Sequence, residues 1–316
     1  MSSTIKRIDC DGAEDFLDVI CPRKGIFKNL PLSARVLYRG QGSSSWKLIP
    51  SALRPEFRQE LHALAGTSVM FENKDCHIAQ MIAELRILSF FEKELDRQGL
   101  EVPRTEVGSV FELLAHYEND FKCGQNHTAP SGFALLQFQN LMSLAQHYGL
   151  PTRLLDWTTS SWTAAYFAAT QGLASTAHSF ADRASVWALH SPVDYITATG
   201  DHHNLRILKI PRSVNANLRS QDGMLTMHTF DGMRVKNDSA IYSASIESSI
   251  VHVNDSDRYG PDHIFLYHMT VPHSELGKVL WWLRKAGIYG SQLFPGHYGA
   301  ARSAREETLY QDPYSR

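Results

Sequence analysis

Short apolar runs, bounded by glycine, proline or polar clusters, predict the strands of this chain. Residues 35–39 (RVLYR) end at Gly40, and residues 184–190 (ASVWALH) and 263–271 (HIFLYHMTV) form two further runs. Runs of this length, rich in aliphatic and aromatic residues, are typical of buried strands. Weaker patterns predict additional short strands at residues 5–8, 205–210 and 224–227.

Helices are predicted where apolar residues recur every three or four positions. Residues 76–98 give the strongest pattern, and Gly99 follows as a typical helix terminator. The apolar stripe of this segment consists of Ile78, Met81, Ile82, Leu85, Leu88 and Phe91. The other helices are predicted at residues 13–20, 110–119, 133–148 (ended by Gly149), 160–170 (capped by Ser160 or Ser161) and 273–286.

The order of these elements predicts an α+β fold. We expect residues 1–316 to form a single domain with a central mixed or antiparallel sheet. Its strands are expected within residues 5–55 and 150–305, and the helical segment of about residues 60–148 is expected to be an insertion between them. No internal repeat, low-complexity segment or linker interrupts this pattern.

Composition indicates an ordinary globular protein. The chain has 316 residues, of which 43% are hydrophobic and 20% charged. A net charge of −2 predicts no overall field that would recruit nucleic acid or an anionic membrane. The four cysteines are far apart and lack CxxC spacing, no apolar segment is long enough to span a bilayer, and the N-terminus lacks an apolar signal core. We therefore expect a soluble, cytoplasmic protein without membrane partners.

The segment 145–169 (AQHYGLPTRLLDWTTSSWTAAYFAA) concentrates polar side chains between two apolar stretches. Burying an unpaired polar group costs roughly 2–7 kcal/mol, so these groups either pair with one another or face a cleft. A turn at Gly149 and Pro151 would direct Arg153 and Asp156 into such a cleft. Residues 37–42 (LYRGQG) have the same character, and we expect the two segments to line one polar site.

Arg39 stands at the end of a predicted strand and precedes two glycines. A guanidinium matches phosphate or carboxylate in geometry, and glycine lets a ligand approach the backbone. A dinucleotide pyrophosphate would therefore be a natural partner of Arg39. The alternative is an internal ion pair, for example with Asp156.

The hydroxyl-rich run Thr158, Thr159 and Ser160 precedes a predicted helix and could bind a phosphate, although helix N-capping is the simpler interpretation. His147 could act as a base with Asp156, but no serine or cysteine nucleophile motif accompanies the pair. His202 and His203 with Asp201 lack a third ligand at metal-site spacing, so no metal site is expected.

Several motifs, in order, resemble those of the FRG-domain family, which is named for its F/Y-R-G motif. They are Tyr38-Arg39-Gly40-Gln41, Trp46 to Ser51 (WKLIPS) with Arg54, Gln146 to Thr158 (QHYGLPTRLLDWT), Ala165 to Ala168 (AYFA), Gln221-Asp222-Gly223 and Leu293 to Gly296 (LFPG). The resemblance extends from about residue 5 to 305, and the long QHYGLPTRLLDWT block makes it specific. The family name does not supply a reaction.

The order of the motifs is also similar to that of ADP-ribosyltransferases. These enzymes bind NAD with an Arg-Gly element, a Ser-Thr-Ser strand end before an A-x-x-F-A helix, and a late glutamate. Arg39-Gly40 matches the first element, and residues 158–160 followed by 164–168 (AAYFA) match the second. Gln221 stands where the glutamate is expected, and a glutamine carries no charge to offset a developing cation. Asp222, Asp156 or Glu247 could supply the missing carboxylate.

This second resemblance implies an enzyme that uses NAD as its substrate. It would transfer ADP-ribose to a protein or nucleic-acid target, or hydrolyse the nicotinamide bond, as a toxin or an anti-phage effector does. The implied catalytic residues are Gln221, Asp156 and His147, and the implied NAD-binding residues are Arg39, Gly40, Gln41, Arg153, Thr158, Thr159, Ser160 and Tyr148. The alternative is a non-catalytic module that senses a nucleotide or a protein with the same cleft.

Overall fold

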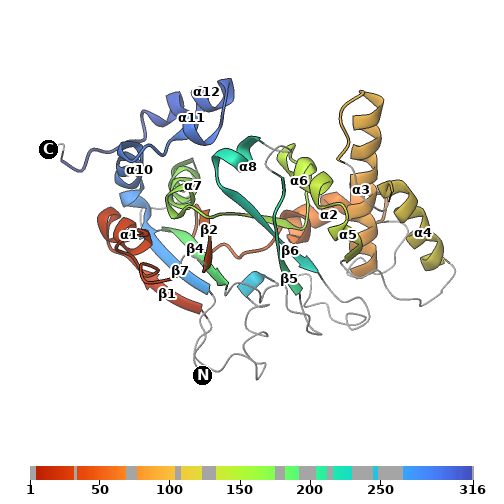
Figure 1. Ribbon diagram of the computed structural model, residues 1–316, viewed down its shortest axis with the longest axis horizontal. Coiled ribbons are helices and arrows are strands. Elements are labelled where there is room, and N and C mark those ends of the chain that lie inside the picture. The colour runs from red at the N-terminus through yellow and green to blue at the C-terminus, as the bar shows by residue number, and fades with distance from the viewer. Residues whose placement is uncertain are drawn as a thin grey trace.

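The computed structural model describes ten segments of the chain (Figure 1). These are residues 5–31, 34–68, 77–103, 108–122, 133–174, 182–191, 204–211, 216–229, 245–247 and 266–314.

The described strands form one seven-stranded mixed sheet in the order β1-β7-β4-β2-β3-β6-β5. The β1–β7 pair is parallel and every other pair is antiparallel. The strands are β1 Ile5–Asp9, β2 Arg35–Gln41, β3 Leu154–Thr158, β4 Arg183–Ser191, β5 Asn204–Leu208, β6 Gly223–Thr229 and β7 Leu266–Pro272. This sheet and its helices confirm the predicted α+β class.

The neighbouring strands β2 and β3, near the middle of the sheet, are only loosely paired. β2 pairs with β4 over Arg35–Gln41, and β3 pairs with β6 over Leu154–Thr158, in each case along the whole strand. β2 and β3 themselves share a single register pair, Tyr38 with Thr158. Because the two strands meet at only one point, their side chains are free to line an opening between the two halves of the sheet.

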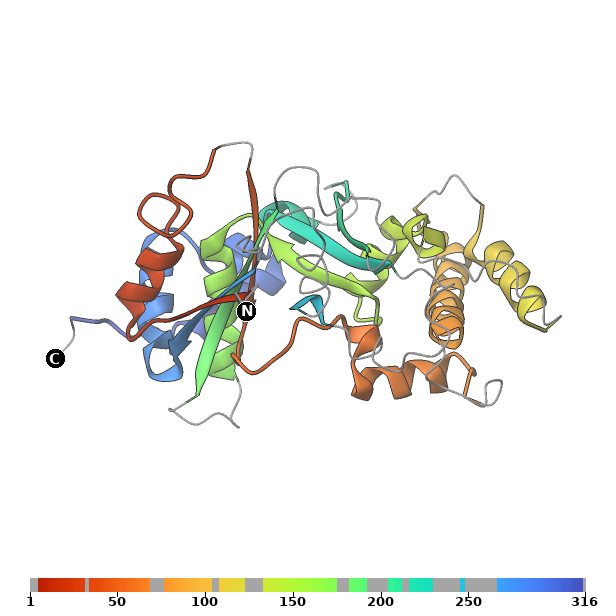
Figure 2. The ribbon, with the colours of Figure 1, turned by 90° about the horizontal axis from the view of Figure 1, so that it is seen from below.

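Two groups of helices flank the sheet, one on each half (Figures 1 and 2). Helices α1, α7 and α10 pack on the half that contains β1, β7, β4 and β2, where they share a hydrophobic core. Helices α2 to α6 follow β2 in the chain and precede β3, and α3 to α6 share a second core with β3, β5, β6 and α8. The helices are α1 Ala13–Ile20, α2 Pro55–Leu64, α3 His77–Arg97, α4 Val110–Lys122, α5 Phe133–Leu136, α6 Gln139–His147, α7 Ser161–Ala174, α8 Ala216–Ser220, α10 Leu276–Lys285, α11 Gly290–Leu293 and α12 His297–Glu306. Two 3-10 turns are also present, η1 Ser51–Leu53 and η3 His273–Glu275.

Most of the predicted elements are confirmed, but one helix is divided and several elements were missed. The helix predicted at residues 133–148 is split into α5 and α6 by a turn at Gln137 and Phe138. Strand β3 was not predicted by periodicity, because its sequence LLDWT is short and Asp156 interrupts the apolar run. Helices α2, α8, α11 and α12 were also missed. Gly99 and Gly149 end their helices at positive φ, 67° and 89°, as expected of helix terminators.

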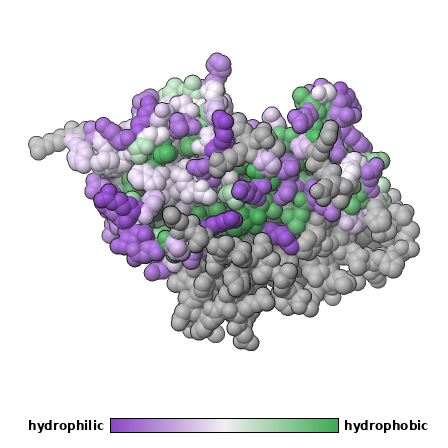
Figure 3. Space-filling model, viewed as in Figure 1, coloured by the Kyte–Doolittle hydropathy of each residue, from purple (hydrophilic) through white to green (hydrophobic). Residues whose placement is uncertain are grey.

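Among the helices of the described segments, none is long and apolar enough to cross a membrane. On the face shown in Figure 3, hydrophilic and hydrophobic side chains alternate over short distances among the coloured residues. Cys10 and Cys21, the cysteines within the described segments, are free thiols.

The Arg39-Gly40 motif has a packing role that the sequence did not reveal. A Cβ atom at Gly40 would lie 1.9 Å from the carbonyl oxygen of Ala164 and 2.6 Å from the amide nitrogen of Ala168. At Gly42 it would lie 2.7 Å from the backbone of Gln171 and Gly172. Helix α7 therefore approaches the backbone of β2 more closely than any side chain allows. The predicted close approach to Gly40 is made by this helix.

We expect Gly40→Ala to destabilise the protein by about 3 kcal/mol or more, because α7 must move away from β2 to make room for the methyl group. The measurement is the free energy of unfolding from urea denaturation. Gly12→Ala is the matched control, since its Cβ would meet only Glu275 Oε2 at 3.8 Å, an ordinary contact. Equal stability of the two variants would contradict the packing role of Gly40.

Candidate functional site

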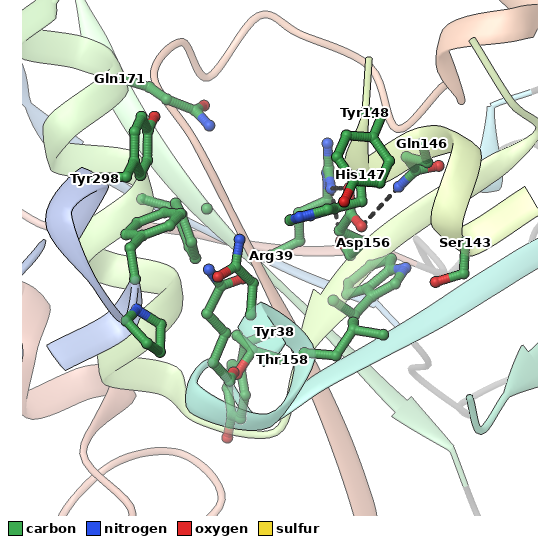
Figure 4. A pocket seen from close by; sticks show the side chains of 18 residues that line it. Tyr38, Arg39, Ser143, Gln146, His147, Tyr148, Asp156, Thr158, Gln171 and Tyr298 are labelled. Carbon is green, nitrogen blue, oxygen red and sulfur yellow. Dashed lines mark hydrogen bonds and ion pairs between the residues drawn. The ribbon is translucent and has the colours of Figure 1, made fainter. Parts of the chain in front are cut away.

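A cleft of about 670 Å3 opens where β2 and β3 diverge (Figure 4). Pockets that hold metabolite-sized ligands have volumes of about 300–1,000 Å3. The walls of the cleft come from β2, β3, α6, α7, α8, α12 and the segment between α11 and α12. The lining residues are Tyr38, Arg39, Gly40, Ser143, Gln146, His147, Tyr148, Asp156, Trp157, Thr158, Phe167, Gln171, Asn217, Leu218, Gln221, Phe294, Pro295 and Tyr298.

Arg39 extends from β2 across the opening toward β3. Its Nη1 donates to the backbone carbonyl oxygen of Asp156 at 2.6 Å and lies 3.9 Å from Asp156 Oδ2. The internal pairing considered for Arg39 is therefore present, mainly through the main chain. The buried Nε of Arg39 has no hydrogen-bond partner among the described residues. Burial lowers the pKa of Arg39, and the Asp156 carboxylate opposes this shift.

Asp156 is the carboxylate that lines the cleft within the described segments. Its side chain is 63% exposed, and its Oδ1 accepts a hydrogen bond from Gln146 Nε2 at 2.7 Å. Desolvation by the surrounding protein raises the pKa of Asp156 from its usual value of 3.8, whereas the Arg39 charge and the Gln146 hydrogen bond lower it. A carboxylate held in this way beside a guanidinium can stabilise a positive charge that develops in a bound substrate.

Thr158 and Gln221 connect the ends of β3 and β6 at the floor of the cleft. Thr158 Oγ1 donates to the Gln221 carbonyl oxygen at 2.7 Å and accepts from the Ser160 amide at 3.0 Å. Gln221 Nε2 donates to the Leu293 carbonyl oxygen at 3.2 Å. The Thr158 hydroxyl is thus occupied by protein groups, whereas the Gln221 Oε1 accepts no hydrogen bond among the described residues.

Aromatic rings form two opposite walls of the cleft. Tyr148 follows α6 and is 69% exposed, and Tyr298 on α12 is 65% exposed. Figure 4 shows them on opposite sides of the opening, with Arg39 between and below them. Behind Tyr298, Phe294 packs edge-on against Tyr298 and Phe167 with ring centroids 5.7 and 6.0 Å apart. Exposed rings of this kind offer stacking surfaces for a planar ligand group.

The structure brings seven of the eleven predicted site residues together in this cleft. They are Arg39, Gly40, His147, Tyr148, Asp156, Thr158 and Gln221. Both segments that were predicted to line one polar site, residues 37–42 and 145–169, contribute side chains to this one cleft.

Arg153 is a correction to the predicted site. Its side chain is fully buried, and it forms a bidentate ion pair with Glu84 of α3, with Nε–Oε2 and Nη2–Oε1 distances of 2.6 and 2.8 Å. The turn at Gly149 and Pro151 therefore directs Arg153 into the interface with the helices and away from the cleft. Arg153 has a structural role here.

Gln41, Thr159 and Ser160 also lie outside the cleft lining. Gln41 is 2% exposed, and its Oε1 accepts from Trp187 Nε1 at 2.8 Å beneath the sheet. Ser160 Oγ accepts from the Thr163 amide at 3.2 Å, which makes it the N-cap of α7. Thr159 is exposed and contacts the neighbouring turn through its backbone. The simpler capping interpretation of the hydroxyl run is thus correct for Ser160.

The other candidate carboxylates lie outside the cleft lining, whereas His147 lines the cleft. Asp222 and Glu247 do not line the cleft, and Glu247 instead accepts the Leu48 amide at 3.0 Å. No hydrogen bond joins His147 to Asp156 in the described part of the chain, where His147 packs edge-on against Tyr148. Within the described segments no cluster of His, Cys, Asp and Glu could hold a metal ion. Residues 201–203 lie outside those segments.

Sequence reasoning did not assign a role to several residues that line the cleft. These are Tyr38, Ser143, Gln146, Trp157, Phe167, Gln171, Asn217, Leu218, Phe294, Pro295 and Tyr298. Six of them carried a signal, because they belong to the motifs of the FRG resemblance: Tyr38, Gln146, Trp157, Phe167, Phe294 and Pro295. Tyr298 and Gln171 had no such signal, because their place depends on how α12 and α7 pack.

Comparison with known proteins supports the first of the two resemblances. The family model of the FRG domain matches residues 34–177, which include the Tyr38–Gln41, 146–158 and 165–168 motifs. The proposed motifs at residues 221–223 and 293–296 lie beyond this match. Searches for similar curated proteins and for similar solved structures found no match. The comparisons therefore identify an FRG domain at residues 34–177 of the chain.

Proposed function

We propose that this protein binds NAD in the β2–β3 cleft and cleaves its nicotinamide–ribose bond. The observation that carries the proposal is the convergence of Arg39, Thr158 and Gln221 on one cleft from adjacent strands or their ends. These residues are the counterparts of the three elements through which ADP-ribosyltransferases bind NAD. The cleft also holds one guanidinium for a pyrophosphate, exposed aromatic rings for planar groups, and one carboxylate.

Each lining group has a chemical role in this proposal. Arg39 binds a phosphate with the N–H groups that do not contact Asp156. Asp156 faces the ribose and stabilises the positive charge that develops there as the bond to nicotinamide breaks. The electron pair of that bond leaves with nicotinamide. Water, or a nucleophilic group of an acceptor, forms the new bond to the ribose carbon and releases one proton.

Asp156 takes the place of the glutamate that this chain lacks at position 221. It lines the cleft, whereas Asp222 and Glu247 do not. Gln221 can accept a hydrogen bond from a ribose hydroxyl through its Oε1, because its Nε2 is held by the Leu293 carbonyl oxygen. The charge and the hydrogen-bonding function of one glutamate are thus divided between two residues.

Arg39→Ala should lower kcat/KM for NAD about 100-fold, since a charge-assisted phosphate contact contributes roughly 1.5–3 kcal/mol and its position orients the substrate. The measurement is nicotinamide release from NAD, with and without cell extract as a source of acceptors. Arg35→Ala is the matched control, an exposed arginine on the same strand. No release by the wild-type protein under both conditions would refute the proposal.

Transfer and hydrolysis are separated by the fate of the ADP-ribose. With NAD labelled in its adenine half, transfer leaves the label on protein or nucleic acid, whereas hydrolysis leaves free ADP-ribose. Either reaction would deplete or divert cellular NAD, as expected of a toxin or an anti-phage defence protein. Induced expression in bacteria, with NAD measured in the extract, tests that role.

A second candidate is a non-catalytic nucleotide sensor, favoured by the uncharged Gln221 at the glutamate position. In that case a ligand should bind without turnover and raise the melting temperature. At a concentration 100 times its Kd, a ligand stabilises the folded state by about 2.7 kcal/mol. Thermal unfolding with NAD, ADP-ribose and cyclic nucleotides, combined with the nicotinamide measurement, distinguishes the two functions.

A further inference from the structure

We propose that Gln146 is a positioning residue, which fixes the Asp156 carboxylate for catalysis, and that the Thr152 hydroxyl holds the Gln146 amide in the orientation that donates to Asp156. The inference rests on the proposed function, in which Asp156 faces the ribose. It assigns a defined purpose to two polar residues of the QHYGLPTRLLDWT block that do not themselves face the reacting bond.

The first step is the hydrogen-bond direction at Thr152. This residue is 3% exposed, and its Oγ1 accepts from the Leu154 amide at 3.2 Å. The hydroxyl proton is then directed to Gln146 Oε1, with which Thr152 Oγ1 forms a short hydrogen bond. The ionised Asp156 carboxylate can only accept, so the Gln146 amide turns its nitrogen to Asp156 and its oxygen to the Thr152 hydroxyl, which donates to it.

The second step follows from this fixed amide. With its oxygen held by Thr152, Gln146 presents its nitrogen to Asp156 Oδ1 and donates to it at 2.7 Å. Asp156 Oδ1 is thereby engaged, and Oδ2 lies 3.9 Å from Arg39 Nη1. In Figure 4 the Gln146 amide approaches Asp156 from the α6 side of the cleft. The carboxylate is held in one rotamer with its second oxygen available to a substrate.

The third step is the anchoring of Thr152 itself. Its backbone is held on both sides by Ser51, because the Thr152 amide donates to Ser51 Oγ and the Ser51 hydroxyl contacts the Thr152 carbonyl oxygen, each at 3.2 Å. The Ala52 amide donates to the same carbonyl oxygen at 3.0 Å. A rigid anchor of this kind keeps the hydroxyl of Thr152 in place, which a positioning role requires.

The test measures the titration of Asp156 directly, by NMR of protein labelled with 13C at the aspartate side-chain carboxyls. The signal of Asp156 is identified by its loss in Asp156→Asn. Gln146→Met keeps the size of the side chain but donates no hydrogen bond. Because that bond stabilises the ionised carboxylate, the pKa of Asp156 should rise by about 1 unit in Gln146→Met.

Thr152→Val should raise the pKa of Asp156 in the same direction, and Thr152→Ser should restore the wild-type titration because it keeps the hydroxyl. Gln137→Met, at an exposed glutamine just before α6, is the matched control. The other lining residues that carry or can take up charge are Arg39 on β2, His147 on α6, and the tyrosines Tyr38, Tyr148 and Tyr298. These residues are the same in every variant.

Turnover gives a second readout. Activity needs the ionised carboxylate, so a higher pKa moves the acid limb of the kcat profile to higher pH, by about 1 unit in Gln146→Met. An Asp156 titration in Gln146→Met that matches the wild type would overturn the positioning role, whatever the turnover. If the wild type releases no nicotinamide, the proposed function fails, and a raised pKa in Gln146→Met still supports the control of Asp156 by Gln146.

Discussion

Arg153→Met should lower the free energy of unfolding by about 3–5 kcal/mol, because it breaks a buried ion pair. The substitution removes both hydrogen bonds to Glu84 and leaves a carboxylate that is 3% exposed without its cation. An uncompensated buried charge is far more costly than the pair was favourable. Urea denaturation, followed by circular dichroism, measures the change.

Two comparisons test whether this loss arises from the buried pair. Arg97→Met removes an exposed pair with Glu94, whose side chains are 76% and 51% exposed, and should cost less than about 1 kcal/mol. Combining Arg153→Met with Glu84→Gln should recover part of the loss, because the buried charge is removed as well. If Arg153→Met remained stable but lost NAD binding, Arg153 would be a ligand-binding residue after all.

The fate of Arg153 shows what the sequence could and could not predict about the site. The pattern around Arg153 correctly indicated that its charge must be paired or directed into a cleft. The choice depended on Glu84, a residue 69 positions earlier on the buried face of α3. Local periodicity identifies that helix face but does not reveal which distant charge lies against it.

Arg39 illustrates the part of the site that was predictable. A guanidinium at the end of a strand, followed by glycine, carried enough local information to indicate a position at the edge of a cleft. The partner segment was also correct, since Thr158 pairs directly with Tyr38. The role of Gly40 was not predictable, because the approach of α7 to its backbone is a tertiary contact.

The QHYGLPTRLLDWT block is best understood as a connector between the helices and the cleft. Arg153 attaches it to α3 through Glu84, and Thr152 attaches it to the 3-10 turn η1 through Ser51. Gln146 donates to the Asp156 carboxylate, and the Asp156 backbone carbonyl oxygen accepts from Arg39 on β2. Most polar residues of the block therefore have a defined partner, which explains how so many polar groups can lie between two apolar segments.

If the protein cleaves NAD as proposed, Asp156→Asn should reduce kcat for nicotinamide release by about 100- to 1,000-fold, because the substituted amide cannot offset a positive charge that develops on the ribose. Asparagine has nearly the same shape and can still accept the Gln146 hydrogen bond, so KM for NAD and the folded structure should change little. In the proposed reaction Asp156 must be ionised, so the acid limb of the pH profile that its titration produces should disappear in this variant.

Comparison with Asp222→Asn tests whether Asp156 or Asp222 supplies the negative charge in the proposed reaction. Asp222 has a φ of 48°, a conformation that asparagine also tolerates, and it lies outside the cleft lining. We expect turnover of Asp222→Asn within about twofold of the wild type, as for surface substitutions away from the site. Wild-type turnover in Asp156→Asn, with loss in Asp222→Asn, would move the catalytic charge from β3 to the turn before β6. The division of the missing glutamate between Asp156 and Gln221 would then be wrong.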